Sequence, residues 1–203
     1  MTQIPRPEHP QPQMKREHWK NLNGEWDFSF DFGCSGIDQK WQEGKTDWEK
    51  KILVPFCPES YLSGIGYKDF IPGVWYHRTI TLTGEELKGD LLLHFGAVDY
   101  DARVWINGVE AGRHQGGYVS FTFNITKLVK EGENDITLFA ADDVRSGKQP
   151  KGKQSHFFYS IGCDYTRTTG IWQTVWLEWV PESYIEKVQY YPNLAEATLG
   201  IKA

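Results

Sequence analysis

Apolar and polar side chains alternate along several short stretches of this sequence, and the period of two predicts β-strands. The clearest stretch is LNGEWDFSFD (residues 22–31), in which Trp26, Phe28 and Phe30 alternate with acidic and hydroxyl side chains. Such a strand presents one apolar face to a core and one polar face to solvent. We expect it to be the first strand of the domain.

Two further β-rich runs follow, with a long loop between them. The runs are KILVPFCPES (residues 51–60) and VWYHRTITL (residues 74–82), and the loop is YLSGIGYKDFIPG (residues 61–73). The loop is longer than a simple connection between strands requires. Long loops on a rigid scaffold often carry function, so residues 61–73 are a candidate binding segment.

The segment DARVWINGVEAGRH (residues 101–114) predicts a β-hairpin. Val104 and Ile106 fall on one face of its first strand and Trp105 falls on the other. The strand ends at Asn107-Gly108, the dipeptide preferred in type I′ turns because both of its residues tolerate positive φ.

Residues 118–143 predict two more strands, joined by a helical turn. The alternating apolar positions are Phe121, Phe123 and Ile125 in the first strand and Ile136, Leu138 and Ala140 in the second. Leu128 and Val129 are expected to face inwards from the turn. Asn124 begins an Asn-Ile-Thr sequence that matches a glycosylation sequon, but we interpret it as a cap of the turn.

A last strand is predicted in IWQTVWLEWV (residues 171–180), where both faces carry large apolar groups, which indicates burial on two sides. Pro181 ends it. About eight or nine strands, local hairpins and no helix of substance indicate an all-β fold, an antiparallel β-sandwich of jelly-roll type over residues 19–181.

The segments on either side of the sandwich differ from it. Residues 1–18 contain four prolines and predict an extended arm without a core of its own. Residues 182–203 predict two strands, with apolar positions at Ile185, Val188 and Tyr190 and then at Ala197, Leu199 and Ile201. Two strands do not make an independent fold. We interpret the tail as the opening of a second domain, the alternative being a hairpin docked on the sandwich.

Composition and charge exclude several partners. The 203 residues carry a formal net charge of -5 and no block of Lys and Arg. Nucleic acids and acidic membrane surfaces require a concentrated basic patch, so neither is an expected partner. The N-terminal stretch has no apolar h-region, and no run approaches the roughly 18 apolar residues of a membrane span. These features predict a cytoplasmic protein.

The residue types that bind metals are scattered. Cys34, Cys57 and Cys163 are odd in number and widely spaced, so we interpret them as free thiols. The histidines lack metal-ligand spacing and are expected to be structural: His77, His94, His114 and His156. No metal and no cofactor are predicted.

Tryptophan is unusually frequent, with nine residues in 203. Indole rings can form a platform for sugar rings, but most of these tryptophans lie on predicted strands and are expected to build the core or a contact with a neighbouring domain. The residues concerned are Trp19, Trp26, Trp75, Trp105, Trp172, Trp176 and Trp179.

Five blocks, in order, resemble the N-terminal sugar-binding domain of glycoside hydrolase family 2, the family of β-galactosidases, β-glucuronidases and β-mannosidases. They are VPFCPES, VWYHR, LLLHFGAVDYDARVWINGVEAGRHQGGYVSFTFNIT, EGENDITL and DYTRTTGIWQTVWLE, and together they span residues 19–181. The resemblance implies a galactose-binding-domain-like jelly roll followed by an immunoglobulin-like domain, begun at residues 182–203, and a (β/α)8 barrel.

The resemblance also implies chemistry that the chain lacks. Family members hydrolyse β-glycosides with retention through two barrel glutamates about 5 to 5.5 Å apart. The Asn-Glu pair that carries the acid/base residue in the family does not occur here. Glu59, Glu110 and Glu178 are expected on turns and solvent faces, so no catalytic residue is assigned and the chain alone is predicted to be inactive.

Substrate-binding residues are predicted by the resemblance in two loops. In relatives, the acid six residues before the glycine of a Gly-Ile pair projects into the catalytic pocket and hydrogen-bonds the sugar. Asp164 keeps this spacing to Gly170. Arg167 is closer to galactosidase-like than to glucuronidase-like members, although one residue does not assign a substrate. The alternative is a local ion pair between Asp164 and Arg167.

Tyr67 and Asp69 align with a family loop that reaches the mouth of the active site, the alternative being an ordinary surface loop. Two function classes therefore remain. The chain is either an accessory domain of a retaining exo-β-glycosidase, with its downstream domains as partners, a β-linked glycoside as substrate and a possible oligomer, or a stand-alone carbohydrate-binding module or lectin-like domain.

Overall fold

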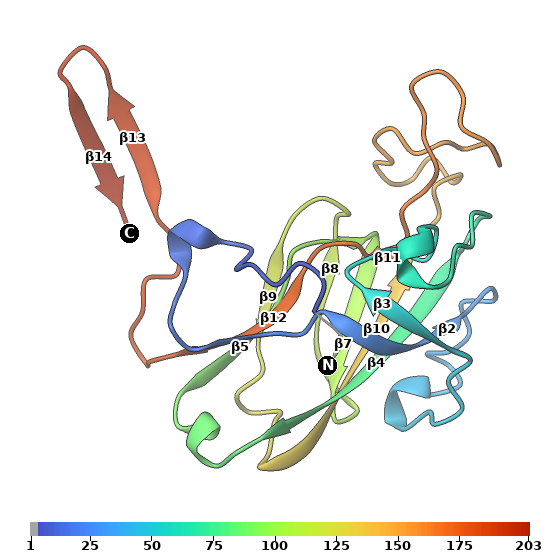
Figure 1. Ribbon diagram of the computed structural model, residues 1–203, viewed down its shortest axis with the longest axis horizontal. Coiled ribbons are helices and arrows are strands. Elements are labelled where there is room, and N and C mark those ends of the chain that lie inside the picture. The colour runs from blue at the N-terminus through green and yellow to red at the C-terminus, as the bar shows by residue number, and fades with distance from the viewer. Residues whose placement is uncertain (1–3) are drawn as a thin grey trace.

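The computed structural model describes residues 4–203 and contains two large antiparallel sheets packed face to face (Figure 1). One sheet has the strand order β1-β12-β5-β9, with bounds Trp19–Asn21, Val175–Val180, Asp90–Phe95 and Phe121–Asn124. The other has the order β3-β2-β4-β10-β7-β8, with bounds Lys50–Val54, Gly24–Phe30, Gly73–Leu82, Gly132–Ala141, Asp101–Ile106 and Val109–Gln115. The all-β antiparallel sandwich is confirmed.

Smaller elements complete the chain. Two-stranded sheets are formed by β6 (Val98–Asp99) with β11 (Gly170–Ile171) and by β13 (Gln189–Asn193) with β14 (Thr198–Lys202). The helices of the described residues are single 3-10 turns, η1 (Pro12–Met14), η2 (Trp41–Glu43), η3 (Tyr61–Ser63) and η4 (Glu85–Leu87). None of them has the length and apolarity that crossing a membrane requires.

The main core lies between the two large sheets and follows the alternation of the sequence. In β2, Trp26 and Phe28 point into it, and in β7, Val104 and Ile106 do the same. Trp105 lies on the opposite face, in a second aromatic cluster with Trp75 and Phe139 that packs against the 37–48 segment. The interior role predicted for the tryptophans is confirmed for Trp26, Trp75, Trp105 and Trp176.

The turn predictions are mostly correct. Asn107 and Gly108 both have positive φ, 52° and 80°, as a type I′ hairpin requires. Asn124 caps its turn as predicted, because its side-chain oxygen accepts a hydrogen bond from the backbone N–H of Thr126 at 3.0 Å. The predicted turn is a single turn closed by a hydrogen bond from the Leu128 N–H to the Ile125 carbonyl, and Leu128 and Val129 pack against the core as expected.

Three strand boundaries differ from the predictions. The first strand is β1 and not the alternating stretch of β2. It has three residues, too few to show an alternating pattern, and it forms by pairing with β12. The expected strand over residues 171–180 is divided into β11 and β12, because Ile171 pairs with Val98 of β6 whereas β12 pairs with β5. At the C-terminus, β13 begins at Gln189, so Ile185 and Val188 precede it.

The N-terminal arm explains why β12 is buried on both faces. Its outer face carries Trp176 and Glu178, and the arm lies across it. His9 packs edge-on against Trp19 at 4.6 Å, and Arg16 donates a hydrogen bond to Glu178 at 2.6 Å. Two-sided burial of the last strand is therefore confirmed, and the arm supplies the second layer.

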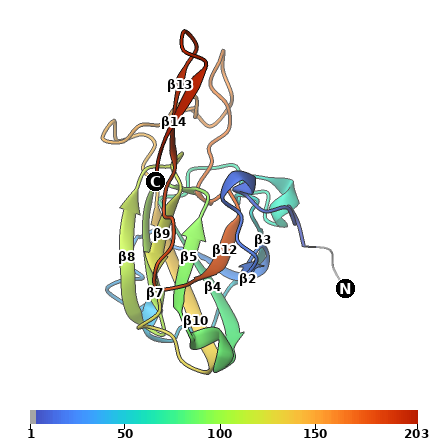
Figure 2. The ribbon, with the colours of Figure 1, turned by 90° about the vertical axis from the view of Figure 1, so that its left-hand side faces the viewer.

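The C-terminal hairpin, β13 with β14, extends away from the sandwich (Figure 2). Every residue of both strands is exposed. The alternative prediction for residues 182–203, a hairpin docked on the sandwich, is wrong, because neither strand of this hairpin is covered by the sandwich. Ala197, expected in the second strand, lies in the turn before β14 with a φ of 48°.

Candidate functional site

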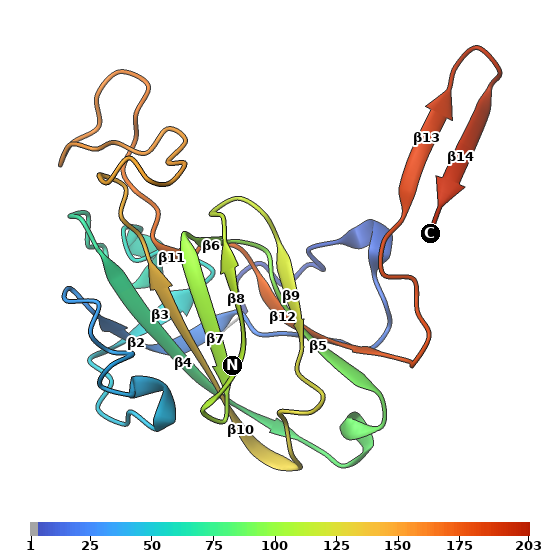
Figure 3. The same ribbon diagram turned by 180° about the vertical axis from the view of Figure 1, so that it is seen from behind.

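The loop between β10 and β11, residues 142–169, projects from one end of the sandwich (Figures 1 and 3). It contains little regular structure: the ladder contacts are isolated bridges between Gln154 and Tyr165 and between Ile161 and Asp164. We call this segment the site loop. Its order comes from side chains that reach back to the sandwich.

Asp164 lies near the tip of the site loop with its carboxylate partly open to solvent. Its Oδ2 is 3.2 Å from Lys151 Nζ, and both side chains are 30% exposed. Lys151 Nζ also donates to the backbone carbonyl of Gln154 at 2.7 Å. The Lys151 ammonium therefore fixes the direction of the Asp164 carboxylate, and the other oxygen, Oδ1, has no partner among the described residues.

Arg167 is buried, with 3% of its surface exposed. Its guanidinium donates to the carbonyls of Ser155 and Phe157 within the site loop and to that of Lys68 in the 61–73 loop. It also lies over the Phe70 ring, 4.3 Å from the centroid. The alternative of an Asp164–Arg167 ion pair is wrong, because Asp164 pairs with Lys151 and Arg167 joins two loops through their carbonyls.

Buried carboxyl groups anchor the base of the site loop. Asp99 is fully buried, and its Oδ2 accepts a hydrogen bond from Gln154 Nε2 at 2.7 Å, while Gln154 Oε1 accepts from the Thr168 N–H at 2.8 Å. Asp99 Oδ1 has no hydrogen-bond partner in the part of the chain that the structure describes. Burial, with the nearby Asp142 charge, raises the pKa of Asp99 to about 7. Gln154 thus connects the sandwich to the loop.

Thr169 connects two more acids. Its hydroxyl donates to Asp142 Oδ2 at 3.0 Å, and its N–H donates to Glu59 Oε2 at 3.2 Å. Burial raises the pKa of Asp142 to about 6 and that of Glu59 to about 7. Glu59 lies on a turn as expected, but it is buried rather than solvent-facing, with 3% of its surface exposed. The expectation is wrong for Glu178, which lies in β12 and is also 3% exposed.

Gly170 explains why the site loop ends where it does. It has a φ of 71°, and a Cβ at this position would collide with the Tyr76 hydroxyl and ring. The Tyr76 hydroxyl in turn accepts the N–H of Ile171 at 3.3 Å. A glycine is therefore required to bring the chain from the loop onto the sandwich.

The other two predicted site residues, Tyr67 and Asp69, have different surroundings in the 61–73 loop. Tyr67 is partly buried and packs against Phe30 and Phe32. Asp69 is exposed in the same loop, close to the backbone that Arg167 holds. The 61–73 loop and the site loop thus lie together, although Asp164 and Tyr67 make no direct contact.

Several large apolar side chains of the site loop are exposed. Phe158, Tyr159, Ile161 and Tyr165 are 65%, 62%, 50% and 59% exposed. Phe158 packs edge-on against Phe70 at 5.0 Å. Four large apolar side chains exposed within residues 158–165 are typical of a segment that contacts a partner surface.

Sequence reasoning missed the anchoring residues Glu59, Asp99, Asp142 and Gln154. Charged residues are usually exposed, so their letters indicate a surface position. One signal was available: Asp142 directly follows the apolar run of β10, which places a carboxyl group at a strand end beside a loop. Among residues 4–203, no group of three or more His, Cys, Asp or Glu side chains has metal-binding geometry.

The sequence profile described as "Glycosyl hydrolases family 2, sugar binding domain" matches residues 19–181. The chain belongs to this family. The match begins with β1 and ends one residue after β12, so the sugar-binding domain of family 2 and the observed sandwich coincide.

Two curated relatives of this chain are both named β-glucuronidase. The β-glucuronidase of Felis catus is 29% identical over 220 residues, which cover 94% of this chain and 33% of the relative. That of Homo sapiens is 27% identical over 208 residues, covering 89% of this chain and 31% of the relative. The chain thus spans about a third of the length of these relatives. These relatives are named β-glucuronidases, whereas Arg167 is closer to the galactosidase-like members of the family.

Solved structures agree on the fold. A β-glucuronidase of an uncultured Clostridium sp. aligns with a TM-score of 0.74 at 24% identity, covering 93% of this chain and 35% of that one. Ruminococcus gnavus β-glucuronidase in complex with uronic deoxynojirimycin aligns with a TM-score of 0.73 at 20% identity, covering 89% and 32%. The sandwich is homologous to the N-terminal region of family 2 β-glucuronidases.

Proposed function

We propose that this chain is the non-catalytic N-terminal jelly-roll domain of a retaining exo-β-glycosidase. In this proposal it docks on a (β/α)8 barrel outside the 203 residues, and residues 182–203 are the first strands of an immunoglobulin-like domain. The support is the one-third share of the relatives' length that the chain spans. An exposed, self-paired hairpin is also what an unfinished sheet looks like.

The position of Asp164 carries the proposal. Its carboxylate has one oxygen held by Lys151 and one free, on a loop that extends beyond the sandwich. A carboxylate held in this way accepts a charge-assisted hydrogen bond from a sugar hydroxyl. The site loop becomes one wall of an active site whose two catalytic carboxyl groups belong to the barrel.

The surroundings of Asp164 support a division of roles. The exposed aromatic side chains form the docking face for the barrel, since such a surface gains most from being covered. Arg167 acts as a positioning residue, because its donors are engaged by backbone carbonyls. Tyr67 and Asp69 remain proposed substrate contacts at the rim formed by the 61–73 loop.

We propose a β-linked glucuronide as the substrate class. The curated relatives reported above are named β-glucuronidases, and a solved Ruminococcus gnavus relative is described in complex with D-glucuronic acid. The retaining mechanism would then proceed through a covalent glycosyl-enzyme intermediate on the barrel, while Asp164 holds the sugar.

The decisive experiment uses the longer protein that carries this chain. Asp164→Asn removes one charge-assisted hydrogen bond and should lower kcat/KM by about one to two powers of ten while leaving Tm unchanged. Asp143→Asn, an exposed acid on the same loop, is the matched control and should leave both unchanged. Unaltered kinetics in Asp164→Asn would remove this residue from the active site.

The 203-residue chain alone should not hydrolyse aryl β-glucuronides or β-galactosides, because both carboxylates of the mechanism lie outside it. Turnover by the purified chain would contradict the proposal. Calorimetric titration addresses the alternative: micromolar affinity of the isolated chain for a simple sugar would favour a stand-alone carbohydrate-binding module or lectin-like domain.

A further inference from the structure

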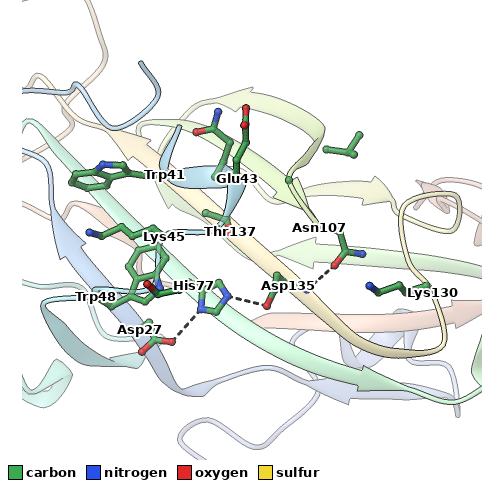
Figure 4. Close-up of a pocket in the computed structure, with 15 residues that line it drawn as sticks. Asp27, Trp41, Glu43, Lys45, Trp48, His77, Asn107, Lys130, Asp135 and Thr137 are labelled. Carbon is green, nitrogen blue, oxygen red and sulfur yellow. Dashed lines mark hydrogen bonds and ion pairs between the residues drawn. The ribbon is translucent and has the colours of Figure 1, made fainter. Parts of the chain in front are cut away.

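A cavity of about 730 Å³ lies on the outer face of the six-stranded sheet, away from the site loop (Figure 4). Its floor is formed by β2, β4 and β10, and its walls are the 41–48 segment and the hairpin turn at Asn107-Gly108. Small-molecule sites usually measure about 300 to 1,000 Å³. The cavity therefore has the size of a ligand site.

Three polar side chains form a row across the floor. His77 Nδ1 is 3.1 Å from Asp27 Oδ2, and His77 Nε2 is 3.0 Å from Asp135 Oδ1. Thr79 also donates to Asp135 Oδ1 at 3.0 Å. The two carboxylates are thereby held in place, and Asp135 Oδ2 has no partner among residues 4–203.

The wall is aromatic, but its ring faces are already occupied. Trp48 stacks on His77 with an interplanar angle of 11°. Lys45 Nζ lies 4.3 Å from the centroid of the Trp41 ring and 5.7 Å from that of Trp48, and the Lys45 side chain is only 9% exposed. Figure 4 shows this lysine between the two indoles. The protein's own ammonium thus fills the aromatic cage, which leaves no place there for a cationic ligand.

Several hydrogen-bonding groups of the cavity remain available. Thr137 lies on the floor, and its hydroxyl is without a hydrogen-bond partner among the described residues. Lys130 supplies a donor at the open end. A ligand with several hydroxyl groups, each able to donate and accept, would satisfy these groups together.

We propose that this cavity binds a neutral saccharide unit, separately from Asp164. The free Oδ2 of Asp135, the Thr137 hydroxyl and the Lys130 ammonium would form hydrogen bonds with hydroxyl groups of the ring. Asp27 is already held by His77 and by Lys51, whose Nζ lies 2.6 Å from Asp27 Oδ1. An anionic sugar is disfavoured because its carboxylate would lie beside Asp135, whose side-chain partners among the described residues are His77 and Thr79, whereas Asp27 is paired with Lys51. This inference does not rest on the proposed function, since it uses residues of the sheet face only.

The test is a titration of the isotope-labelled 203-residue chain by NMR, with cellobiose and methyl β-D-galactoside as neutral probes. Sodium glucuronate is the anionic probe and tetramethylammonium the cationic one. The indole N–H signals of Trp41 and Trp48, assigned with Trp41→Phe and Trp48→Phe, report on the cavity. A neutral probe should shift them with millimolar affinity, and the two charged probes should bind more weakly.

Variants separate this site from the site loop. Asp135→Asn should weaken binding of the neutral probe about tenfold, the loss expected for one charge-assisted hydrogen bond. Thr137→Val, which keeps the side-chain shape, should weaken it less, and Asp164→Asn should leave it unchanged. The inference is overturned if no neutral probe shifts the indole signals, if tetramethylammonium binds instead, or if Asp164→Asn and not Asp135→Asn abolishes the shifts.

The two proposals fail independently. Loss of kcat/KM in Asp164→Asn of the longer protein without any saccharide effect at Trp48 would keep the proposed function and overturn the cavity. Saccharide-induced shifts of the Trp48 signal together with unaltered kinetics in Asp164→Asn would keep the cavity proposal and overturn the proposed role of Asp164.

Discussion

The site loop and the C-terminal hairpin both extend beyond the sandwich, but different interactions hold them. The hairpin is regular, with five paired positions between β13 and β14, yet all of its residues are exposed. The site loop is irregular, yet Arg167, Gln154 and Thr169 anchor it in the interior. Regular backbone pairing therefore does not measure how firmly a segment is attached, whereas buried side-chain contacts do.

The largest expected effect comes from removing the guanidinium that joins the two loops. Arg167→Ala leaves three carbonyls without a donor and Glu59 and Asp142 without a nearby positive charge, so it should lower the free energy of unfolding by about 3 kcal/mol. Arg145, on the same Phe70 ring but exposed, is the matched control, and Arg145→Ala should cost less than about 1 kcal/mol. Urea denaturation of both variants measures the difference, and equal losses would contradict the anchoring role.

A smaller effect is expected at the contact between the sandwich and the site loop. Gln154→Ala leaves the buried Asp99 carboxyl without a partner and should cost about 2 kcal/mol. Gln149→Ala should cost less than about 1 kcal/mol, because Asp142 keeps the Thr169 hydroxyl. Hydrogen exchange should rise across residues 151–169 in the first variant only; protection that stays as in the wild type would argue against this contact.

The buried acids make the anchoring pH-dependent. Burial raises the pKa of Asp99 and Glu59 to about 7, above the usual values of about 4 that apply in the unfolded chain. Between about pH 4 and pH 7 the folded state therefore binds more protons, so stability is greatest at the acid end, falls as pH rises through this window and levels off above it. Each of the two groups should lower the free energy of unfolding by about 2 kcal/mol from pH 5 to pH 7.

Asp99→Asn tests the origin of this dependence. The amide does not ionise, so the free energy of unfolding of the variant should depend less on pH than that of the wild type. The difference between the two proteins should change between about pH 4 and pH 7. Asp143→Asn, an exposed acid of the same loop, should keep the wild-type slope. A slope unaffected by Asp99→Asn would assign the effect to other groups.

The smallest effect is expected at the hairpin. Deleting residues 182–203 removes no core contact, so Tm of the sandwich should change by no more than about 2 °C. Calorimetry of the truncated chain measures it. A substantial loss of stability would mean that the hairpin, like the site loop, has an anchor in the sandwich.

Local patterns were sufficient to predict much of the fold. The alternation around Phe28 and the Asn107-Gly108 dipeptide identified strands and a turn, because the signal and the structure lie within a few residues. The boundaries of β1 and β11 were not predicted. Each is too short to show a period and exists only because a distant strand pairs with it.

The site was predicted less completely than the fold. The spacing of Asp164 to Gly170 identified the loop that the proposed function uses, but not the Lys151 partner or the buried acids. The contact between Thr169 and Glu59 joins residues 110 positions apart. Burial of a carboxyl group depends on such long-range packing, which a short stretch of sequence does not record.

The pairing of β1 with β12 has a mechanical consequence. Trp19, where the sandwich begins, lies opposite Glu178, two residues before its last strand ends. Tension transmitted through the neighbouring segments would therefore pull on two adjacent antiparallel strands from the same end. The hydrogen bonds between them would then be loaded one after another rather than all at once, as in a zipper, so the domain should open at this seam under low force, while its interior strands carry none of the load.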